Sequence, residues 1–344
     1  MVGVNALTSC QLLQPCEAPH LFKPGAQTHG NKRTKVKVTA CSQWLVQGRR
    51  EVLLGGSLTL ITALGAPAWA ADESYRPADI RLDLAPDQSK YDAADEDLRD
   101  AAGKLQLALN AENVKDEERL WTELIDKYEG SKAPWRADIV GRAYGNRGNA
   151  RSRQGKMDIA LVDYNRAIEI CPWSVDPVLN RGVLYENTNR YSEAEQDYRT
   201  VLAAMPNDPS GWNNLGNVAL AQQKWTESAG YYQKAMQLAP AFSFAGANRT
   251  LALYAGGQTN EAMREMRSLL RRYPDFDDPR AALAAAEWEL GQYERAEGDW
   301  NRVQDPRYAD KEWLLRTRRW PAKLCEALQA FLEIRMTRKS PSAA

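Results

Sequence analysis

The sequence predicts an all-α solenoid of about five to six helix pairs, because a repeat of 34 residues runs through its centre. Four prolines are spaced 34 residues apart: Pro172, Pro206, Pro240 and Pro274. When proline is set at repeat position 32, small residues recur at positions 8 and 20, and an aromatic or methionine recurs at position 24. A fixed period of this length is typical of stacked helical hairpins, in which each hairpin buries its apolar face against its neighbours.

The recurring residues suit two closely packed helices. Small side chains at positions 8 and 20 allow the helices to approach, and the aromatic at position 24 fills the space between them. Proline ends the second helix because it has no N–H to donate. With Trp212, Leu215 and Gly216 forming a W-x2-L-G opening, the pattern resembles the tetratricopeptide repeat family. The resemblance covers four consecutive units and implies a right-handed superhelix whose first helices line a concave groove.

The first part of the chain predicts a targeting presequence. Residues 1–40 are basic and almost free of acids, which is typical of an organelle transit peptide. Residues 41–70 contain Arg49 and Arg50, a short apolar run and an A-x-A ending at Ala70, which are typical of a twin-arginine export signal. Together they resemble a bipartite presequence for the chloroplast thylakoid lumen. An uncleaved membrane anchor and a bacterial export signal are the alternatives.

The remaining segments are predicted in chain order. Residues 71–92 lack a helical period and form a linker or an extended arm. The solenoid then covers 93–335. Its parts are a degenerate capping unit over 98–131, strong units over 141–174, 175–208, 209–242 and 243–276, a weak unit over 277–310, and closing helices over 310–319 and 321–335.

Composition argues against several classes of function. Both histidines, His20 and His29, lie in the presequence, so the mature chain lacks the commonest general base and imidazole metal ligand. It also carries more acidic than basic residues, so it lacks the excess of positive charge that indicates nucleic-acid binding. The apolar run of the presequence is shorter than the roughly 20 residues of a membrane span. We therefore expect no enzyme, no catalytic residue, no cofactor, no metal and no membrane span in the mature chain.

A column of asparagines at position 6 is the feature that indicates a function. It contains Asn146, Asn180, Asn214 and Asn248, which lie about 200° from the apolar stripe and should point away from the core. The column resembles the asparagine ladder of O-GlcNAc transferase, which implies a groove that holds an extended peptide by its main chain. Neighbouring groove positions add Arg142, Asn149, Arg153 and Asn217 to the predicted peptide-binding residues. The alternative is an inherited feature of the repeat that binds nothing.

A basic aromatic cluster near the C-terminus is a candidate docking patch. It contains Trp313, Arg318, Arg319 and Trp320. The alternative is that the tryptophans cover the last repeat while the arginines stay solvated. Ser210 and Asn214 stand where a chaperone-tail clamp has basic residues, which disfavours an adaptor of that kind.

Two functions remain open. The first is a non-enzymatic adaptor that holds an extended segment of a thylakoid protein, in photosystem assembly or repair. The second is a structural subunit that docks into a larger thylakoid complex through its helical ends.

Overall fold

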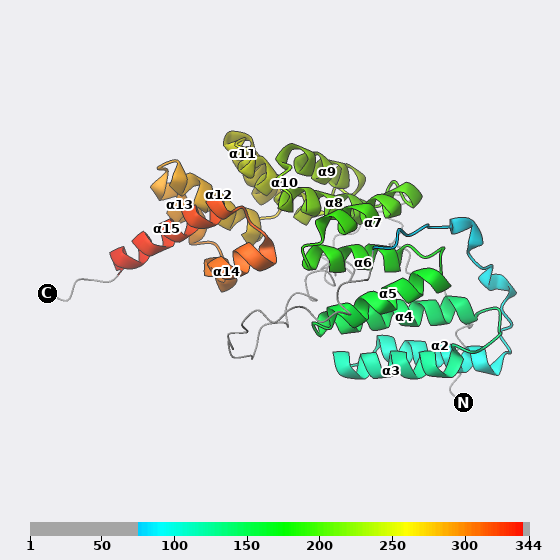
Figure 1. Ribbon diagram of the computed structural model, residues 1–344. Helices are drawn as coiled ribbons and strands as arrows, with labels where there is room; N and C mark the ends of the chain where they lie inside the picture. Colours follow the sequence, from blue (N-terminus) through cyan, green and yellow to red (C-terminus); the bar gives the residue numbers. More distant parts are fainter. Residues whose placement is uncertain (1–74, 340–344) are drawn as a thin grey trace, which may run out of the picture. The chain divides into compact units, whose positions relative to one another are not determined.

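The computed structural model describes residues 75–339, and within that range the regular structure is helical throughout. Successive helices pack as antiparallel pairs (Figure 1), so the predicted all-α repeat fold is confirmed. The described chain forms two compact units, one ending at Arg181 and one beginning at Gly182. The predicted presequence, residues 1–70, lies outside the described residues. Between residues 75 and 339, none of the helices combines the length and apolarity needed to cross a bilayer.

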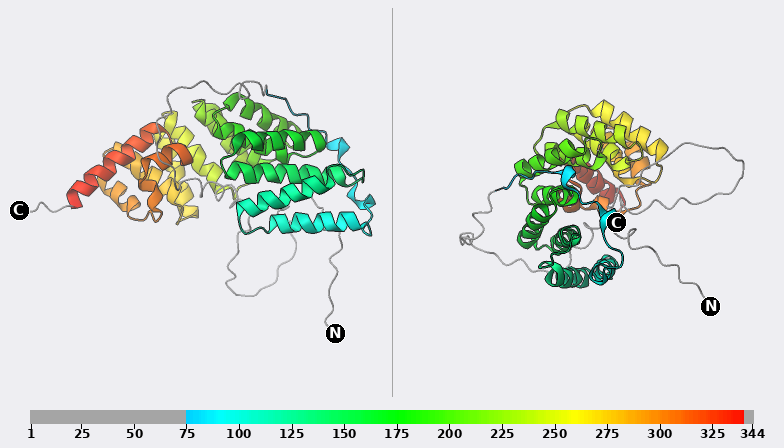
Figure 2. Two further views of the ribbon diagram at one scale, coloured as in Figure 1. Left: turned by 60° about the horizontal axis from the view of Figure 1, so that its bottom comes forward. Right: turned by 90° about the vertical axis from the view of Figure 1, so that its right-hand side faces the viewer.

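The first unit contains the degenerate pair and the first strong pair. Its helices are α2 (Glu96–Leu109), α3 (Val114–Tyr128), α4 (Arg136–Arg153), α5 (Met157–Ile170) and the start of α6 (Asp176–Asn187). Figure 2 shows α2 to α5 lying side by side. Asp95 and Asn113 cap α2 and α3 by accepting from backbone N–H groups, which satisfies donors that a helix start leaves free. Trp121, Leu124 and Ile139 are fully buried in the shared core.

The segment predicted as a linker or arm packs along the first unit. Residues 75–92 contain two short 3-10 turns, η3 (Leu82–Leu84) and η4 (Gln88–Lys90). The amide of Arg81 donates to the carbonyl of Pro172 at 2.8 Å, and Gln88 Nε2 donates to Asp138 Oδ2 at 2.7 Å. These contacts fix the segment to α4 and to the end of α5.

The second unit contains the remaining repeats. After the end of α6, its helices are α7 (Tyr191–Ala204), α8 (Pro209–Ala221), α9 (Trp225–Leu238), α10 (Ser243–Ala255), α11 (Thr259–Arg272), α12 (Asp277–Glu289) and α13 (Tyr293–Trp300). The glycine and tyrosine columns meet as expected. A Cβ added to Gly216 would lie 2.7 Å from the ring of Tyr232, and one added to Gly182 would lie 2.7 Å from the ring of Tyr198. Only glycine lets these helices approach so closely.

The C-terminal closing segment differs from the prediction. In place of one helix over 310–319, the chain forms η5 (Pro306–Ala309), a single turn α14 (Lys311–Trp313) and a π-helical turn η6 (Leu314–Arg318), before α15 (Ala322–Lys339). Arg319 then adopts a left-handed conformation with φ of 54°. Because Pro321 disfavours helical backbone at Trp320, the helix cannot continue. Trp320 is instead buried in the core of the unit.

Candidate functional site

The first unit presents two of the four predicted ladder asparagines. Asn146 in α4 and Asn180 in α6 are both half-exposed. Neither side chain hydrogen-bonds to another residue within 75–339. An asparagine amide carries one acceptor oxygen and an NH2 donor, which match the N–H and C=O of one peptide unit. These two side chains can therefore hold a peptide backbone without first breaking an internal contact.

The flanking residues predicted in the first unit are already engaged. Arg142 Nε pairs with Asp138 Oδ1 at 3.1 Å, and Arg153 pairs with Glu117. Asn149 Oδ1 accepts a hydrogen bond from the hydroxyl of Tyr164 at 2.8 Å. Asn149 therefore holds the tyrosine of its own repeat by a hydrogen bond. The positive charges of the two arginines are partly neutralised by their carboxylate partners.

In the second unit, Asn214 does not point into solvent as the ladder prediction requires. Its exposed fraction is 4%, and that of the neighbouring Asn213 is 7%. Asn213 Nδ2 donates to Asn214 Oδ1 at 3.4 Å, and Asn248 Nδ2 donates to Asn213 Oδ1 at 3.3 Å. Buried amides need such partners because their burial without one costs free energy. Asn217 is only partly buried, but its Oδ1 is engaged, since it accepts from the hydroxyl of Tyr232 at 2.8 Å.

The closing segment reaches the last ladder residue. Arg318 binds both carboxylate oxygens of Asp278, with Nε 2.8 Å from Oδ1 and Nη2 2.6 Å from Oδ2. The same Nη2 lies 3.5 Å from Asn248 Oδ1. Asp278 also accepts from the hydroxyl of Tyr308 at 3.1 Å and from the indole N–H of Trp320 at 3.2 Å. A side chain of the chain's own closing segment thus contacts Asn248.

The four residues of the predicted docking patch make internal contacts. Trp320 is only 3% exposed, and Trp313 packs edge-on against Tyr308 with ring centroids 5.2 Å apart. Arg319 pairs with Glu186 of α6, and its Nη2 donates to Asn187 Oδ1 at 3.1 Å. The tryptophans therefore cover the last repeat, but Arg318 and Arg319 do not stay solvated. Buried carboxylates attract them because an unpaired buried charge is costly.

Two sets of interacting charged residues were not predicted from the sequence. The first is a charge pair within single repeats: Arg147 Nη2 lies 2.8 Å from Asp163 Oδ1, and Arg249 pairs with Glu265. Each pair is 16 residues apart, and this recurring spacing could have revealed it. The second is the acceptor Asp278, whose arginine lies 40 residues away in a segment without a period. No local pattern signals that contact.

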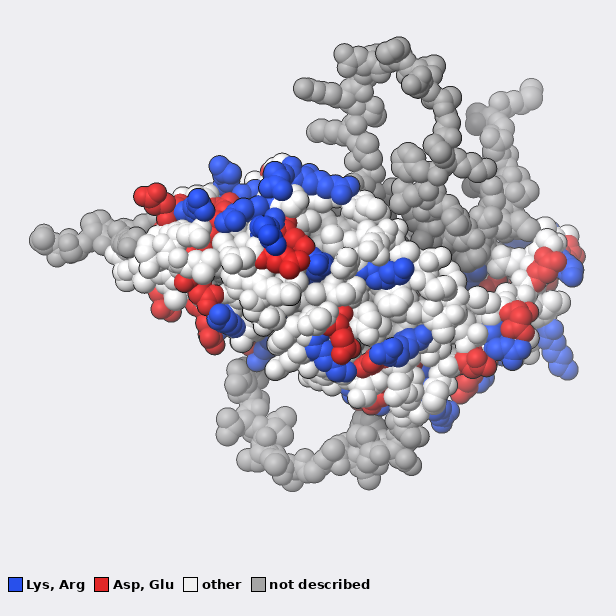
Figure 3. Space-filling view, turned by 90° about the horizontal axis from the view of Figure 1, so that it is seen from above, with Lys and Arg blue, Asp and Glu red and all other residues white. Residues whose placement is uncertain are grey.

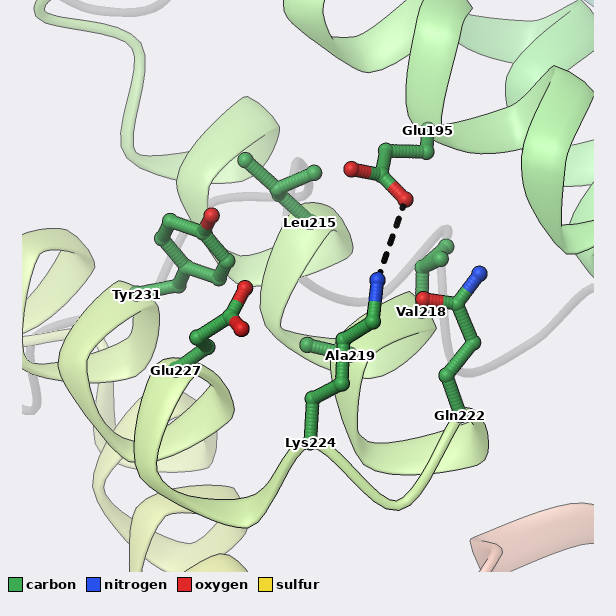
Figure 4. A pocket seen from close by; sticks show the side chains of 8 residues that line it. All are labelled: Glu195, Leu215, Val218, Ala219, Gln222, Lys224, Glu227 and Tyr231. Atoms are coloured by element: carbon green, nitrogen blue, oxygen red, sulfur yellow. Dashed lines mark ion pairs between the residues drawn. The ribbon is translucent and has the colours of Figure 1, made fainter.

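Two further observations concern sites for small ligands. Figure 4 shows a small pocket where Lys224 Nζ lies 3.8 Å from Glu195 Oε2, but it has no space even for a water molecule. Across residues 75–339, no group of His, Cys, Asp and Glu side chains is placed to hold a metal ion.

Comparison with known families identifies the repeats. Models described as "Tetratricopeptide repeat" match residues 141–174, 179–241 and 248–275. A tetratricopeptide repeat protein from Parabacteroides merdae is similar in structure, with a TM-score of 0.52 and 16% identity, over 72% of this chain and 93% of that one. The APC/C hetero-tetramer Cut9-Hcn1 gives a TM-score of 0.51 and 15% identity, over 69% of this chain and 42% of that one. At these identities, the likeness concerns the fold.

The curated relatives share only a short stretch. Mouse sperm-associated antigen 1 is 39% identical over 66 residues, and the human protein is 38% identical over 66 residues. These matches cover 19% of this chain and 7% of each relative. The chain therefore corresponds to a small fraction of the relatives' length, and their activities do not transfer. Residues 141–275 carry tetratricopeptide repeats, the fold of protein-binding scaffolds that are generally not enzymes.

Proposed function

We propose that this chain is a non-enzymatic scaffold that holds an extended protein segment by its main chain. The observation that carries the proposal is the state of Asn146 and Asn180, which are accessible and make no hydrogen bond to any described residue. The other two ladder residues bind differently, because Asn214 is buried and Asn248 is engaged by Arg318. The first unit therefore supplies the main-chain contacts, and little preference for the ligand's side chains is expected.

The test compares partner capture by the wild type and by the double variant N146A/N180A. A net hydrogen bond contributes about 0.5–1.5 kcal/mol, so loss of both amides should weaken binding by about ten- to a hundredfold. The matched control is N207A/N260A, which removes two exposed asparagines that lie outside the ladder. Each variant is used to capture proteins from isolated thylakoid lumen. The proposal is supported if the control recovers a protein that N146A/N180A does not recover. Equal recovery by a folded N146A/N180A variant would reject it.

The proposed location is the thylakoid lumen, and the proposed process is photosystem assembly or repair. Support for the location comes from the basic leader, Arg49 and Arg50, and the A-x-A ending at Ala70. Replacing Arg49 and Arg50 with lysine should block import into isolated thylakoids. Import that continues unchanged and ignores the proton gradient would overturn the twin-arginine assignment.

The second candidate function is a structural subunit that docks through a helical end. It is favoured by Leu107 and Leu109, which are 62% and 50% exposed at the end of α2, the first long helix described. Substituting both with serine should abolish incorporation into a larger complex if this function is the true one. N146A/N180A should then incorporate normally.

A further inference from the structure

A second candidate binding site lies within the second unit, among α11, α12 and α13. It is an open cleft of about 520 Å³. Arginines dominate its lining, which also includes two carboxylates: Arg267, Arg271, Arg280, Arg295, Arg302, Glu287 and Asp299. Figure 3 views the molecule from the side on which α11 lies in Figure 1, and Lys and Arg gather there beside a few acidic groups. The cleft therefore carries a positive charge although the mature chain is mildly acidic.

Two side chains that line this cleft are buried and have an unpartnered polar atom. Arg280 is 6% exposed; its Nη1 donates to Asp299 Oδ1 at 3.2 Å and its Nη2 donates to the carbonyl of Pro274, while Nε has no acceptor. Glu287 is 2% exposed; its Oε1 accepts from Arg267 Nη2 at 2.8 Å, while Oε2 has no donor. Leaving such groups unsatisfied costs free energy. Neither atom is accessible to solvent, so the charged groups that the cleft presents to a ligand are its exposed arginines, Arg271, Arg295 and Arg302.

The arginines are spread along the cleft and do not converge on one point. Arg267 and Arg271 are one turn apart on α11, about 6 Å along the helix axis. Arg295 lies in α13 and Arg302 lies just after its end, about 10 Å further along. A single phosphate or carboxylate cannot reach all of them. Several carboxylates along one chain can, and the arginine fork binds a carboxylate through two parallel hydrogen bonds.

We propose that this cleft binds an acidic segment of a partner protein. Arg271, Arg295 and Arg302 pair with its glutamate or aspartate side chains. This site is separate from the asparagines of the first unit and does not depend on the function proposed for them.

The first test measures binding of a short fluorescein-labelled glutamate-rich peptide to the full mature chain. The wild type should bind it, and the same peptide with glutamine in place of glutamate should not bind. The variant R271E should weaken binding about tenfold or more, since reversing one contact of this kind removes at least about 1.4 kcal/mol. R272E is the matched control, because Arg272 is exposed in the same last turn of α11 but does not line the cleft. It should leave binding within about twofold of the wild type.

The second test fills the cleft without changing its charge. Gly298 lines it, and a Cβ added there meets no atom within 4 Å, so the variant G298L extends into the open space. Gly230 occupies the same repeat position in α9 and is equally unobstructed, which makes G230L the control. G298L should abolish peptide binding, G230L and N146A/N180A should retain it, and all variants should keep the wild-type helicity by circular dichroism.

Three results would overturn the proposal. The first is the absence of glutamate-peptide binding to the wild type. The second is equal binding by folded R271E, R272E, G298L and G230L. The third is binding of inorganic phosphate alone, lost in R271E, with no binding of the peptide. The third result would make the cleft a site for a small anion and exclude a protein partner.

Discussion

At the scale of the residue, the glycine and tyrosine columns explain why the repeats pack so closely. Gly216 faces the ring of Tyr232, which is completely buried. The variant G216A places a methyl group 2.7 Å from that ring, so the helices must separate. We expect a loss of about 1–3 kcal/mol in the free energy of unfolding, measured by urea denaturation.

The control for this substitution lies in the same repeat. Gly230 has no atom within 4 Å of its virtual Cβ, so G230A should keep or raise stability, because alanine favours a helix by about 1 kcal/mol over glycine. If G216A and G230A had the same effect, the close contact would not limit the packing.

A second residue-scale prediction concerns acid stability. Burial alone would raise the pKa of Glu118, but hydrogen bonds from Lys156, Arg151 and Gln154 lower it to about 2. Because this pKa is below that of the unfolded chain, the stabilisation is fully present above about pH 4.5 and is lost as the pH falls towards 2. The variant E118Q should therefore cost on the order of 3 kcal/mol at pH 7 and progressively less below pH 4.5.

The measurement is urea unfolding of the wild type and E118Q at pH 7 and near pH 3. Glu123 in the same helix gives a control, since its side chain is 51% exposed and its ion pair with Arg119 is on the surface. E123Q should change stability by less than about 1 kcal/mol at either pH. A difference between wild type and E118Q that does not shrink in acid would refute the assignment.

At the scale of the element, the closing segment is held by ion pairs to two buried carboxylates, and the pair between Arg318 and Asp278 is the more deeply buried. Asp278 is 1% exposed, so the variant R318A leaves a buried carboxylate without its cation and should cost about 3–5 kcal/mol. The double variant R318A/D278N should be less destabilised, because asparagine carries no charge. Chymotrypsin cleavage after Trp313, which is followed by Leu314 in the same segment, should become faster in R318A.

The nearby Arg316 gives the comparison. Its side chain is 80% exposed and pairs with Glu312 at 2.5 Å, so R316A should cost less than about 1 kcal/mol and leave cleavage unchanged. Similar behaviour of R316A and R318A would mean that the segment is not fixed by Asp278.

The repeated elements were predictable from the sequence, and the irregular ones were not. The unit predicted over 209–242 contains α8 (Pro209–Ala221) and α9 (Trp225–Leu238), because proline and the small residues recur at fixed positions. The closing segment has no sequence period, so no local pattern predicted its π turn or the left-handed conformation of Arg319. Helix geometry predicted that the ladder asparagines point away from the core. Asn146 is half-exposed, but neighbouring contacts bury Asn214, and a pattern within one helix does not show those contacts.

At the scale of the whole molecule, the two units have separate hydrophobic cores. One core contains Trp121, Leu124 and Ile139, and the other contains Met266, Leu324 and Phe331. In a solenoid each helix pair is stabilised mainly by its nearest neighbours, so damage at one end need not unfold the other. Stability should then be local, and a single melting temperature would not describe the chain.

Native-state hydrogen exchange tests this with one cavity in each core. Leu124 and Leu324 are fully buried, and each leucine-to-alanine change should cost about 2–5 kcal/mol. L124A should reduce amide protection mainly in α2 to α5 and leave α10 to α15 near the wild-type level. L324A should produce the reverse pattern, because α15 packs on α12 and lies in the other core. If either substitution lowered protection equally along residues 75–339, the chain would unfold as one cooperative body, and separate binding sites in its two units would be energetically coupled.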